Sequence, residues 1–255
     1  MKLSFVIPAH NEEDHIGNCL SSIFQRLEGI PRDVEVIVVN NASTDGTGRV
    51  ARGYPGAIVV DEPRKGLLFA RRAGFERATG DLVANVDADT MLTPGWIETV
   101  MSEFEKDPEL VCLSGPFVYY DVSMWARAWQ KFFYGLGYFA YLINRFVLKV
   151  NSMVQGGNFV IKKSAFEQAG GFDTTIDFYG EDTDVARRLN KMGHAKFTFG
   201  LPMYASGRRV AEEGVFSTGF RYGINYFWVT FSGKPLTKTS TDVRTPKITD
   251  TAEKG

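Results

Sequence analysis

Short apolar runs alternate with amphipathic stretches along the first third of the chain. Four runs have the length and composition of strands: residues 3–9, 34–39, 57–60 and 82–86. Between them, residues 16–27 place apolar side chains on one face of a helix, and residues 67–78 form another predicted helix. Strands that alternate with helices predict a mainly parallel sheet, whose ligands lie beyond the carboxyl ends of its strands. The expected fold class is therefore α/β, with a central sheet flanked by helices.

Two carboxylates follow the fourth predicted strand. Residues 82–86 are mostly apolar, as in a central strand covered on both faces, and Asp87 and Asp89 come directly after them. Side chains two apart on a strand share a face, roughly 7 Å from each other. The pair could hold Mn²⁺ or Mg²⁺, which prefer oxygen ligands and leave positions open for substrate phosphates. The structural alternative is a polar turn that merely ends the strand.

Residues 124–150 depart from this pattern, with nine aromatic residues, four basic residues and no acid. Apolar side chains recur on one predicted helix face, opposite a face of tyrosines with Arg127, Lys131, Arg145 and Lys149. Such a helix suits an anionic membrane surface or the wall of a groove for a lipid-linked acceptor. It equally suits a helix that packs its apolar face on the sheet. A bend or break is expected at residues 135–137 because of two glycines.

The charge balance, the cysteines and the length of the apolar runs bear on which partners and which setting the protein has. The 255 residues carry 29 Lys and Arg against 30 Asp and Glu, so no overall charge attracts nucleic acid. Cys19 and Cys112 lie in apolar patterns, which favours buried free thiols and a reducing, cytoplasmic setting. We expect neither a signal peptide nor a spanning helix, because the apolar runs are too short. Residues 214–231 form a second aromatic segment, and residues 233–255 are a polar tail expected to be mobile.

Several sequence blocks resemble glycosyltransferase family 2. They are VIPAHNEEDHIGNCLSSI, VIVVNNASTDGTGRVA, KGLLFARRAGFERATGDLVANVDADT and GGFDTTIDFYGEDTDVARRLNKMG. The resemblance implies the GT-A fold of nucleotide-diphospho-sugar transferases, with Mn²⁺ or Mg²⁺ as cofactor. It also implies one domain over residues 1–232, with a nucleotide-binding half at 1–115 and an acceptor half at 116–232.

The resemblance also implies roles for individual residues. Those against the nucleoside, its ribose or the metal would be Pro8, Ala9, Glu12, Arg71, Asp87 and Asp89. The base that deprotonates the acceptor would be Asp182, with Glu181 as its neighbour. The glycine-rich segment of Gly156, Gly157 and Asn158 brings backbone close to a ligand, which we expect to be the donor sugar.

Asn41 departs from the family pattern. Where relatives often have an acid that accepts from the uracil N3–H, the Asn41 amide can accept or donate, so the identity of the base is less certain. Uridine remains the first choice. Arg208 and Arg209 could bind pyrophosphate oxygens with their guanidinium groups, or form a solvated basic turn.

The predicted function is inverting transfer of a sugar from a UDP-sugar to a hydroxyl of a lipid-linked or glycan acceptor, with possible contact at the inner face of the cytoplasmic membrane. A sugar-phosphate nucleotidyltransferase is less favoured, because Pro8-Ala9-His10-Asn11 is not the glycine-rich loop that it needs after the first strand. A catalytically silent carbohydrate- or lipid-binding relative is the other alternative, although it need not retain Asp87, Asp89, Glu181 and Asp182.

Overall fold

The computed structural model describes residues 1–29, 33–148, 153–174 and 180–232. The predicted tail at residues 233–255 and the end of the predicted helix at residues 149–150 lie outside these ranges.

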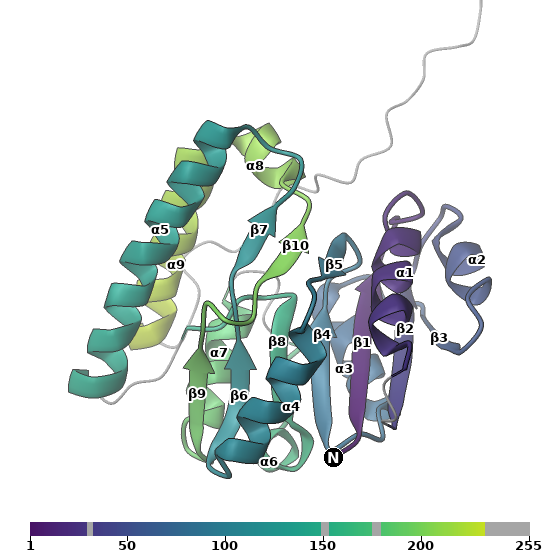
Figure 1. Cartoon of the computed structure of the whole chain (residues 1–255), viewed down its shortest axis with the longest axis horizontal. Helices are drawn as coiled ribbons and strands as arrows, with labels where there is room; N and C mark the ends of the chain where they lie inside the picture. Colours follow the sequence, from purple (N-terminus) through teal and green to yellow (C-terminus); the bar gives the residue numbers. More distant parts are fainter. Residues whose placement is uncertain (30–32, 149–152, 175–179, 233–255) are drawn as a thin grey trace, which may run out of the picture.

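A seven-stranded sheet forms the centre of the molecule (Figure 1). Its spatial order is β3-β2-β1-β4-β8-β6-β9, and only β8 runs antiparallel to its two neighbours. The strands are β1 (Leu3–Ala9), β2 (Val34–Asn41), β3 (Ala57–Glu62), β4 (Leu82–Val86), β6 (Leu110–Ser114), β8 (Asn158–Lys162) and β9 (His194–Phe197). The four apolar runs therefore form the predicted strands, and the α/β fold class is confirmed.

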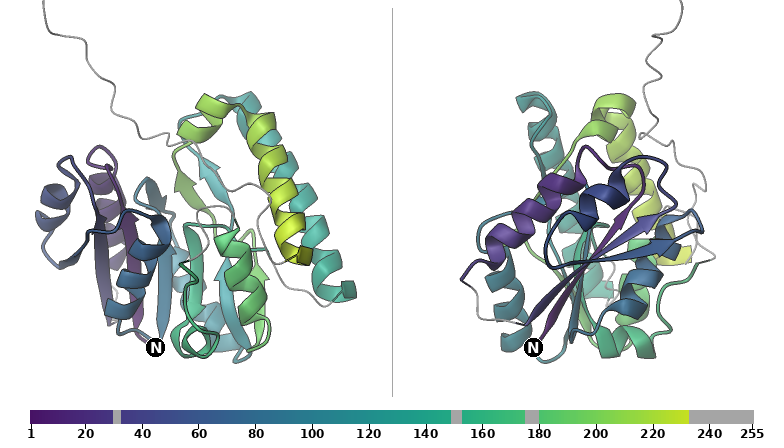
Figure 2. Two further views of the ribbon diagram at one scale, coloured as in Figure 1. Left: turned by 180° about the vertical axis from the view of Figure 1, so that it is seen from behind. Right: turned by 90° about the vertical axis from the view of Figure 1, so that its right-hand side faces the viewer.

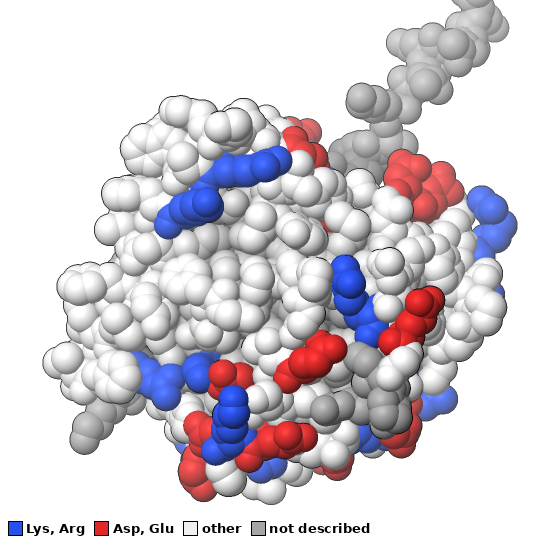
Figure 3. Space-filling view, viewed as in Figure 1, with Lys and Arg blue, Asp and Glu red and all other residues white. Residues whose placement is uncertain are grey.

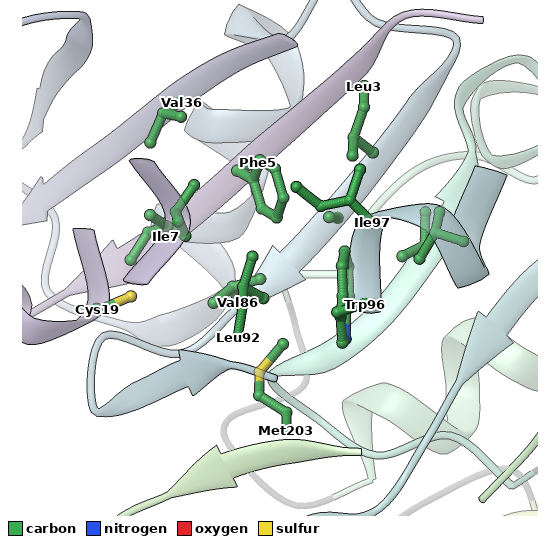
Figure 4. Packing of buried hydrophobic residues seen from close by; sticks show 14 of the residues in the cluster. Leu3, Phe5, Ile7, Cys19, Val36, Val86, Leu92, Trp96, Ile97 and Met203 are labelled. Atoms are coloured by element: carbon green, nitrogen blue, oxygen red, sulfur yellow. The ribbon is translucent and has the colours of Figure 1, made fainter. Parts of the chain in front are cut away.

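Helices cover both faces of this sheet. One face carries α1 (Ile16–Leu27), α2 (Thr47–Arg52) and α4 (Trp96–Lys106), and the other carries α3 (Leu67–Arg77), α6 (Lys163–Gln168) and α7 (Glu181–Leu189). Figure 4 shows the core under the first face, where Phe5 of β1 packs with Trp96 and Ile97 of α4 and Ile7 lies nearer Cys19 of α1. Both cysteines are buried free thiols, as predicted.

A smaller sheet lies beyond the carboxyl ends of the central strands. It contains β5 (Thr90–Leu92), β10 (Met203–Ala205) and β7 (Phe117–Tyr119) in that order. The chain passes from β6 to β7 through Gly115, where a Cβ would overlap the backbone of Leu201. Three-residue strands there carry the chain from the main sheet toward the aromatic helices.

Two long helices lie side by side at one edge of the molecule (Figures 1 and 2). They are α5 (Met124–Ile143), continued by a π-helical segment, η1 (Asn144–Leu148), and α9 (Val215–Ser232), which follows the short α8 (Arg208–Glu213). Of the bend or break predicted at residues 135–137, the break is wrong, since α5 runs through both glycines. None of the helices in the described residues is sufficiently long and apolar to cross a membrane.

The orientation of α5 decides between the two interpretations of this helix. Tyr134 and Tyr141 face the protein, where the Tyr134 hydroxyl accepts a hydrogen bond from the Phe117 amide and Tyr141 is buried. The apolar side faces outward, with Trp125 58% and Phe139 65% exposed. Figure 3 shows a broad area over α5 without Asp or Glu. The alternative in which the apolar face packs on the sheet is therefore wrong for the described part of the helix.

Candidate active site

A cavity of about 1260 Å³ lies beyond the carboxyl ends of β1, β2 and β4. Its size exceeds the roughly 300–1,000 Å³ of ordinary small-molecule sites, so it has room for more than one ligand. All but two of the site residues predicted from the sequence line it: Pro8, Ala9, Glu12, Asn41, Arg71, Asp87, Asp89, Gly156, Glu181, Asp182, Arg208 and Arg209.

The two aspartates lie in a turn, because β4 ends at Val86. The Asp87 carbonyl accepts hydrogen bonds from the Thr90 amide and hydroxyl at 3.1 and 2.7 Å, which fixes the turn into β5. The expected strand-like spacing of Asp87 and Asp89 is therefore wrong, although both still line the cavity. Their different neighbours give the two carboxylates different charge environments.

Gly157 makes room for Asp87. Its φ of +80° is a left-handed conformation that favours glycine, and a Cβ there would overlap the Asp87 carboxylate. The neighbouring Gly156 amide donates a hydrogen bond of 3.1 Å to Asp182 Oδ2. The glycine-rich segment thus brings its backbone close to the two carboxylates, Asp87 and Asp182.

Asn158 does not reach the cavity. Its side chain is fully buried, where it accepts from Trp96 Nε1 at 3.1 Å and donates to the carbonyls of Gly115 and Leu201 at 3.0 and 2.9 Å. These partners hold the connection between the two sheets. The expected contact of Asn158 with the donor sugar is therefore not supported, and neither Gly157 nor Asn158 lines the cavity wall.

Arg71 joins two carboxylates that are far apart in the sequence. Its guanidinium pairs with Glu181 and lies 3.3 Å from Asp87 Oδ1, and the side chain is only 1% exposed. Two anions neutralise a buried cation, which would otherwise be costly to desolvate. This placement argues against the expected contact of Arg71 with the base or ribose and makes it a link between Asp87 and Glu181.

Glu181 and Asp182 begin α7, directly after Gly180 in the left-handed conformation. Glu181 is buried against Arg71, whereas Asp182 is half-buried and lines the cavity. Burial raises the pKa of both carboxyl groups, with the Arg71 guanidinium opposing the shift at Glu181. The Asp182 carboxylate accepts from the Thr183 amide at 2.7 Å and from the Gly156 amide, which orients it.

Arg208 lies between Glu12 and Asp89. Its Nη2 is 2.5 Å from Glu12 Oε1 and 3.0 Å from Asp89 Oδ2. Burial raises the pKa of Asp89 to about 6, although the Arg208 guanidinium opposes this shift. Arg209 instead pairs with Glu213 at 3.2 Å, one turn along α8. The two arginines therefore differ, and Arg208 is the one beside the expected metal ligand.

Asn41 organises a loop of the cavity wall. Its amide nitrogen donates to the carbonyls of Glu62 and Arg64 at 3.2 and 2.7 Å, and its oxygen accepts from the Gly66 amide at 2.8 Å. The buried side chain is thus already hydrogen-bonded at both ends. This arrangement weakens the expectation that Asn41 recognises the base.

Within the described residues, no group of three His, Cys, Asp or Glu side chains is arranged to hold a metal ion. Asp87 and Asp89 are two hard oxygen donors on one cavity, which fits a cation whose remaining ligands are diphosphate oxygens and water. The raised pKa of Asp89 fits such a cation too, because a positive charge would stabilise the carboxylate.

The sequence pattern allowed a groove wall on the aromatic helix, but it did not predict that α9 would form the other side of this apolar part of the cavity. Leu136, Phe139 and Ile143 of α5 and Gly219 and Gly223 of α9 line it. The aromatic composition of both segments was the available signal, but periodicity did not show that their sides would meet.

Comparison with known proteins identifies relatives. The family model described as Glycosyl transferase family 2 matches residues 4–170. A "4,4'-diaponeurosporenoate glycosyltransferase" of Staphylococcus aureus is 40% identical over 119 residues, which are 44% of this chain and 30% of that protein. The chain thus matches less than a third of that relative's length.

Solved structures show the same fold. A Pyrobaculum calidifontis mannosyltransferase in complex with GDP-Man and Mn²⁺ has a TM-score of 0.67 at 22% identity, over 91% of this chain and 63% of that one. Glucosyl-3-phosphoglycerate synthase of Mycobacterium tuberculosis, in complex with Mn²⁺, UDP-glucose and phosphoglyceric acid, has a TM-score of 0.62 at 19% identity, over 92% and 80%.

Proposed function

Because the chain belongs to glycosyl transferase family 2, we propose that it is an inverting, metal-dependent enzyme. It moves a sugar from a nucleotide-diphosphate sugar, with UDP as the first choice of nucleotide, to a hydroxyl of a lipid-linked or glycan acceptor. Neighbours solved with GDP-Man and with UDP-glucose support a nucleotide-sugar donor. The relative named for 4,4'-diaponeurosporenoate supports a lipid-related acceptor.

The observation that carries the proposal is the meeting of two sets of carboxylates at one cavity. Asp87 and Asp89 come from the end of β4, and Asp182 comes from the start of α7. A nucleotide-sugar donor needs a place for its diphosphate, and inverting sugar transfer also needs a base for the acceptor hydroxyl. Burial of these carboxylates is costly, and a cavity that holds both the diphosphate site and the base gives a functional reason for it.

In the proposed reaction, Asp182 accepts the proton of the acceptor hydroxyl as its oxygen attacks the anomeric carbon. The bond from that carbon to the diphosphate breaks, and the configuration inverts. The amides of Gly156 and Thr183 keep the Asp182 carboxylate in place before the reaction. Arg71 pairs with Glu181, the neighbour of Asp182, and also with Asp87.

A divalent cation, when bound, would be held by Asp87 and Asp89 and would stabilise the charge on the departing diphosphate. Arg208 already supplies positive charge beside Asp89 and is available to the same phosphates.

We also propose reversible contact with a membrane surface through the outward face of α5. The same helix carries the exposed Lys131, and Arg127, whose guanidinium donates to the Tyr120 carbonyl at 2.8 Å. Exposed apolar area next to cations suits an interface with anionic headgroups.

Replacement of Asp182 by Asn tests the catalytic assignment. The amide is nearly isosteric but does not accept a proton, so sugar transfer, or donor hydrolysis where the acceptor is unknown, should fall by at least ~10²-fold. Affinity for UDP with Mn²⁺ should stay within about twofold. Asp61→Asn, an exposed carboxylate paired with Arg52, is the matched control. Near-normal turnover of Asp182→Asn would remove Asp182 from the role of base.

A further inference from the structure

The cavity continues past the catalytic carboxylates into the space between α5 and α9. Most of its wall there is apolar or small, with Leu136, Phe139 and Ile143 on α5 and Gly219, Gly223 and Ile224 on α9. Uncharged polar side chains of the same helices complete it: Gln130, Tyr134, Thr218, Tyr222 and Asn225. No Asp, Glu, Lys or Arg of α5 or α9 is among the described residues that line it. A sugar would bind weakly to such a wall, because its hydroxyl groups would lose hydrogen bonds to water.

This apolar part of the cavity is open to the outside where α5 lines it. Leu136 is 53% and Phe139 is 65% exposed, although both line the cavity. They belong to the same outward apolar side of α5 as Trp125 and Phe132, which are 58% and 53% exposed. This opening at the apolar side of α5 lets an apolar molecule enter without crossing the polar half of the cavity.

The same part of the cavity reaches the catalytic helix. Helix α9 contacts α7, which begins at the Glu181 and Asp182 pair. One continuous wall thus runs from Leu148 near the end of the aromatic helix to Asp182. A long molecule in it would have one end at the base and the other between the two helices.

We propose that the space between α5 and α9 binds the apolar chain of the acceptor, so that the acceptor is a single-chain lipid with a nucleophilic oxygen at its head. This inference rests on the proposed function and names the acceptor class for it. The head oxygen gives its proton to Asp182 and forms the new bond to the anomeric carbon, while the bond from that carbon to the diphosphate breaks. The chain takes no part in the chemistry and positions the head.

The chain's own C-terminal segment is a poorer occupant. Residues 233–255 contain eight charged side chains and six threonines, which an apolar wall does not match. A lipid chain instead gains from each methylene removed from water. The length of the apolar wall therefore favours a ligand whose affinity depends on its chain length.

Gly223 offers a direct way to fill this space. It lines the cavity within α9, and a Cβ there meets no atom within 4 Å, so the first atom of a leucine side chain has room and Gly223→Leu adds bulk at this wall. Gly135 on α5 has equally open surroundings but is exposed and does not line the cavity. Gly135→Leu is therefore a matched control, and Gly223→Ala is a milder variant at the test position.

The test measures binding of straight-chain alcohols from butanol to hexadecanol, by competition with pyrene-labelled hexadecanol below its aggregation concentration, with UDP and Mn²⁺ present. Each methylene that enters the cavity should strengthen binding by about threefold to fourfold. Gly223→Leu should weaken hexadecanol binding by at least about tenfold, whereas Gly135→Leu should stay within about twofold. Gly223→Ala should lie between wild type and Gly223→Leu.

Affinity without dependence on chain length, or equal affinities of Gly223→Leu and Gly135→Leu, would overturn the inference. Dimerisation that hides α5 and α9 would overturn it too, since hexadecanol would then not bind. UDP binding with Mn²⁺ is measured in the same samples and should not change in either leucine variant. Intact UDP binding without alcohol binding rejects the lipid acceptor alone, whereas loss of UDP binding by wild type rejects the proposed function.

Discussion

At the scale of single residues, the site is built from charges that lie in unfavourable surroundings. Asp89, Glu181 and Asp182 all have a pKa raised by burial, while Arg71 and Arg208 partly compensate for this cost. Buried charged groups of this kind are typical of functional sites, because replacement by packed apolar side chains often leaves a protein equally or more stable. Substitutions here should therefore separate binding, catalysis and stability.

Asp89→Asn should remove most of the gain in UDP affinity that Mn²⁺ provides, because an amide is a much weaker ligand for a hard cation than a carboxylate. The UDP affinity measured without metal should stay within about twofold of wild type. Titration calorimetry with and without Mn²⁺ measures both values. Equal losses in the two conditions would show that Asp89 is not a metal ligand, and Asp61→Asn controls for charge.

Gly157→Ala should destabilise the protein and weaken Mn²⁺-dependent UDP binding. Its φ of +80° costs a residue with a side chain roughly 1–2 kcal/mol, and the added methyl group displaces the Asp87 carboxylate. Gly135→Ala, in the open interior of α5, should instead raise stability by about 0.5–1 kcal/mol. Thermal unfolding of both variants checks the pair, and an unchanged Gly157→Ala would contradict the steric argument.

At the scale of elements, α5 carries different functions on its two sides. Tyr134 and Tyr141 fix the helix to the protein through their rings and hydroxyl groups. The opposite side exposes aromatic and aliphatic residues, and Trp125 and Trp129 contact Phe216 of α9. The helix is thus attached by its tyrosine side and by the two tryptophans near its start, whereas Phe132, Leu136 and Phe139 on its apolar side stay exposed.

Membrane adsorption should follow from this outward side. Wild-type protein should sediment with anionic vesicles at low salt and less at high salt, because each cation near anionic headgroups contributes about 1 kcal/mol. Arg127→Gln with Lys131→Gln should weaken sedimentation by about tenfold or more. Arg52→Gln with Arg72→Gln, on exposed positions of α2 and α3, is the control. Wild type that stays in the supernatant would reject the membrane contact.

At the scale of the whole molecule, the active site joins segments that are distant in sequence. Arg71 and Glu181 are 110 residues apart, and Glu12 and Arg208 are 196 apart. The sheet brings the loops after β1 and β4 together, and α7 and α8 complete the site from the second half. Stability and ligand binding should therefore be coupled through the same carboxylates.

The melting temperature without ligands should rise between pH 7.5 and 5.5. Because the folded pKa of Asp89 is about 6 and its ordinary value is 3.8, the folded state binds more protons in this range, so stability increases as pH falls. Glu62, whose pKa the Arg64 hydrogen bonds lower to about 2, acts in the opposite direction only at lower pH. Thermal unfolding at the two pH values should differ by a few degrees.

Asp89→Asn should reduce this pH dependence, since one of the carboxylates that take up a proton is gone. Mn²⁺ with UDP should also reduce it, because bound cations favour the ionised carboxylate. A melting temperature that falls steadily from pH 7.5 to 5.5 would contradict the raised pKa of the site carboxylates.

The sequence by itself determined the fold class and most members of the site. Short apolar runs between helical patterns specify a parallel sheet, because strand and helix periodicities differ and are local properties of the chain. The ends of such strands are where ligands bind, so Asp87 and Asp89 could be identified there. The resemblance in the sequence blocks added Glu181 and Asp182, and both line the same cavity.

Tertiary structure alone decided which groups each residue meets. The Asn158 amide forms hydrogen bonds with three other segments of the chain, and Arg71 pairs with a carboxylate 110 residues away. Periodicity shows that α5 has two different sides but does not say which one has a partner, because that depends on the shape of the surface it meets. The outward apolar side and the cavity beside α9 arise only when distant segments pack together.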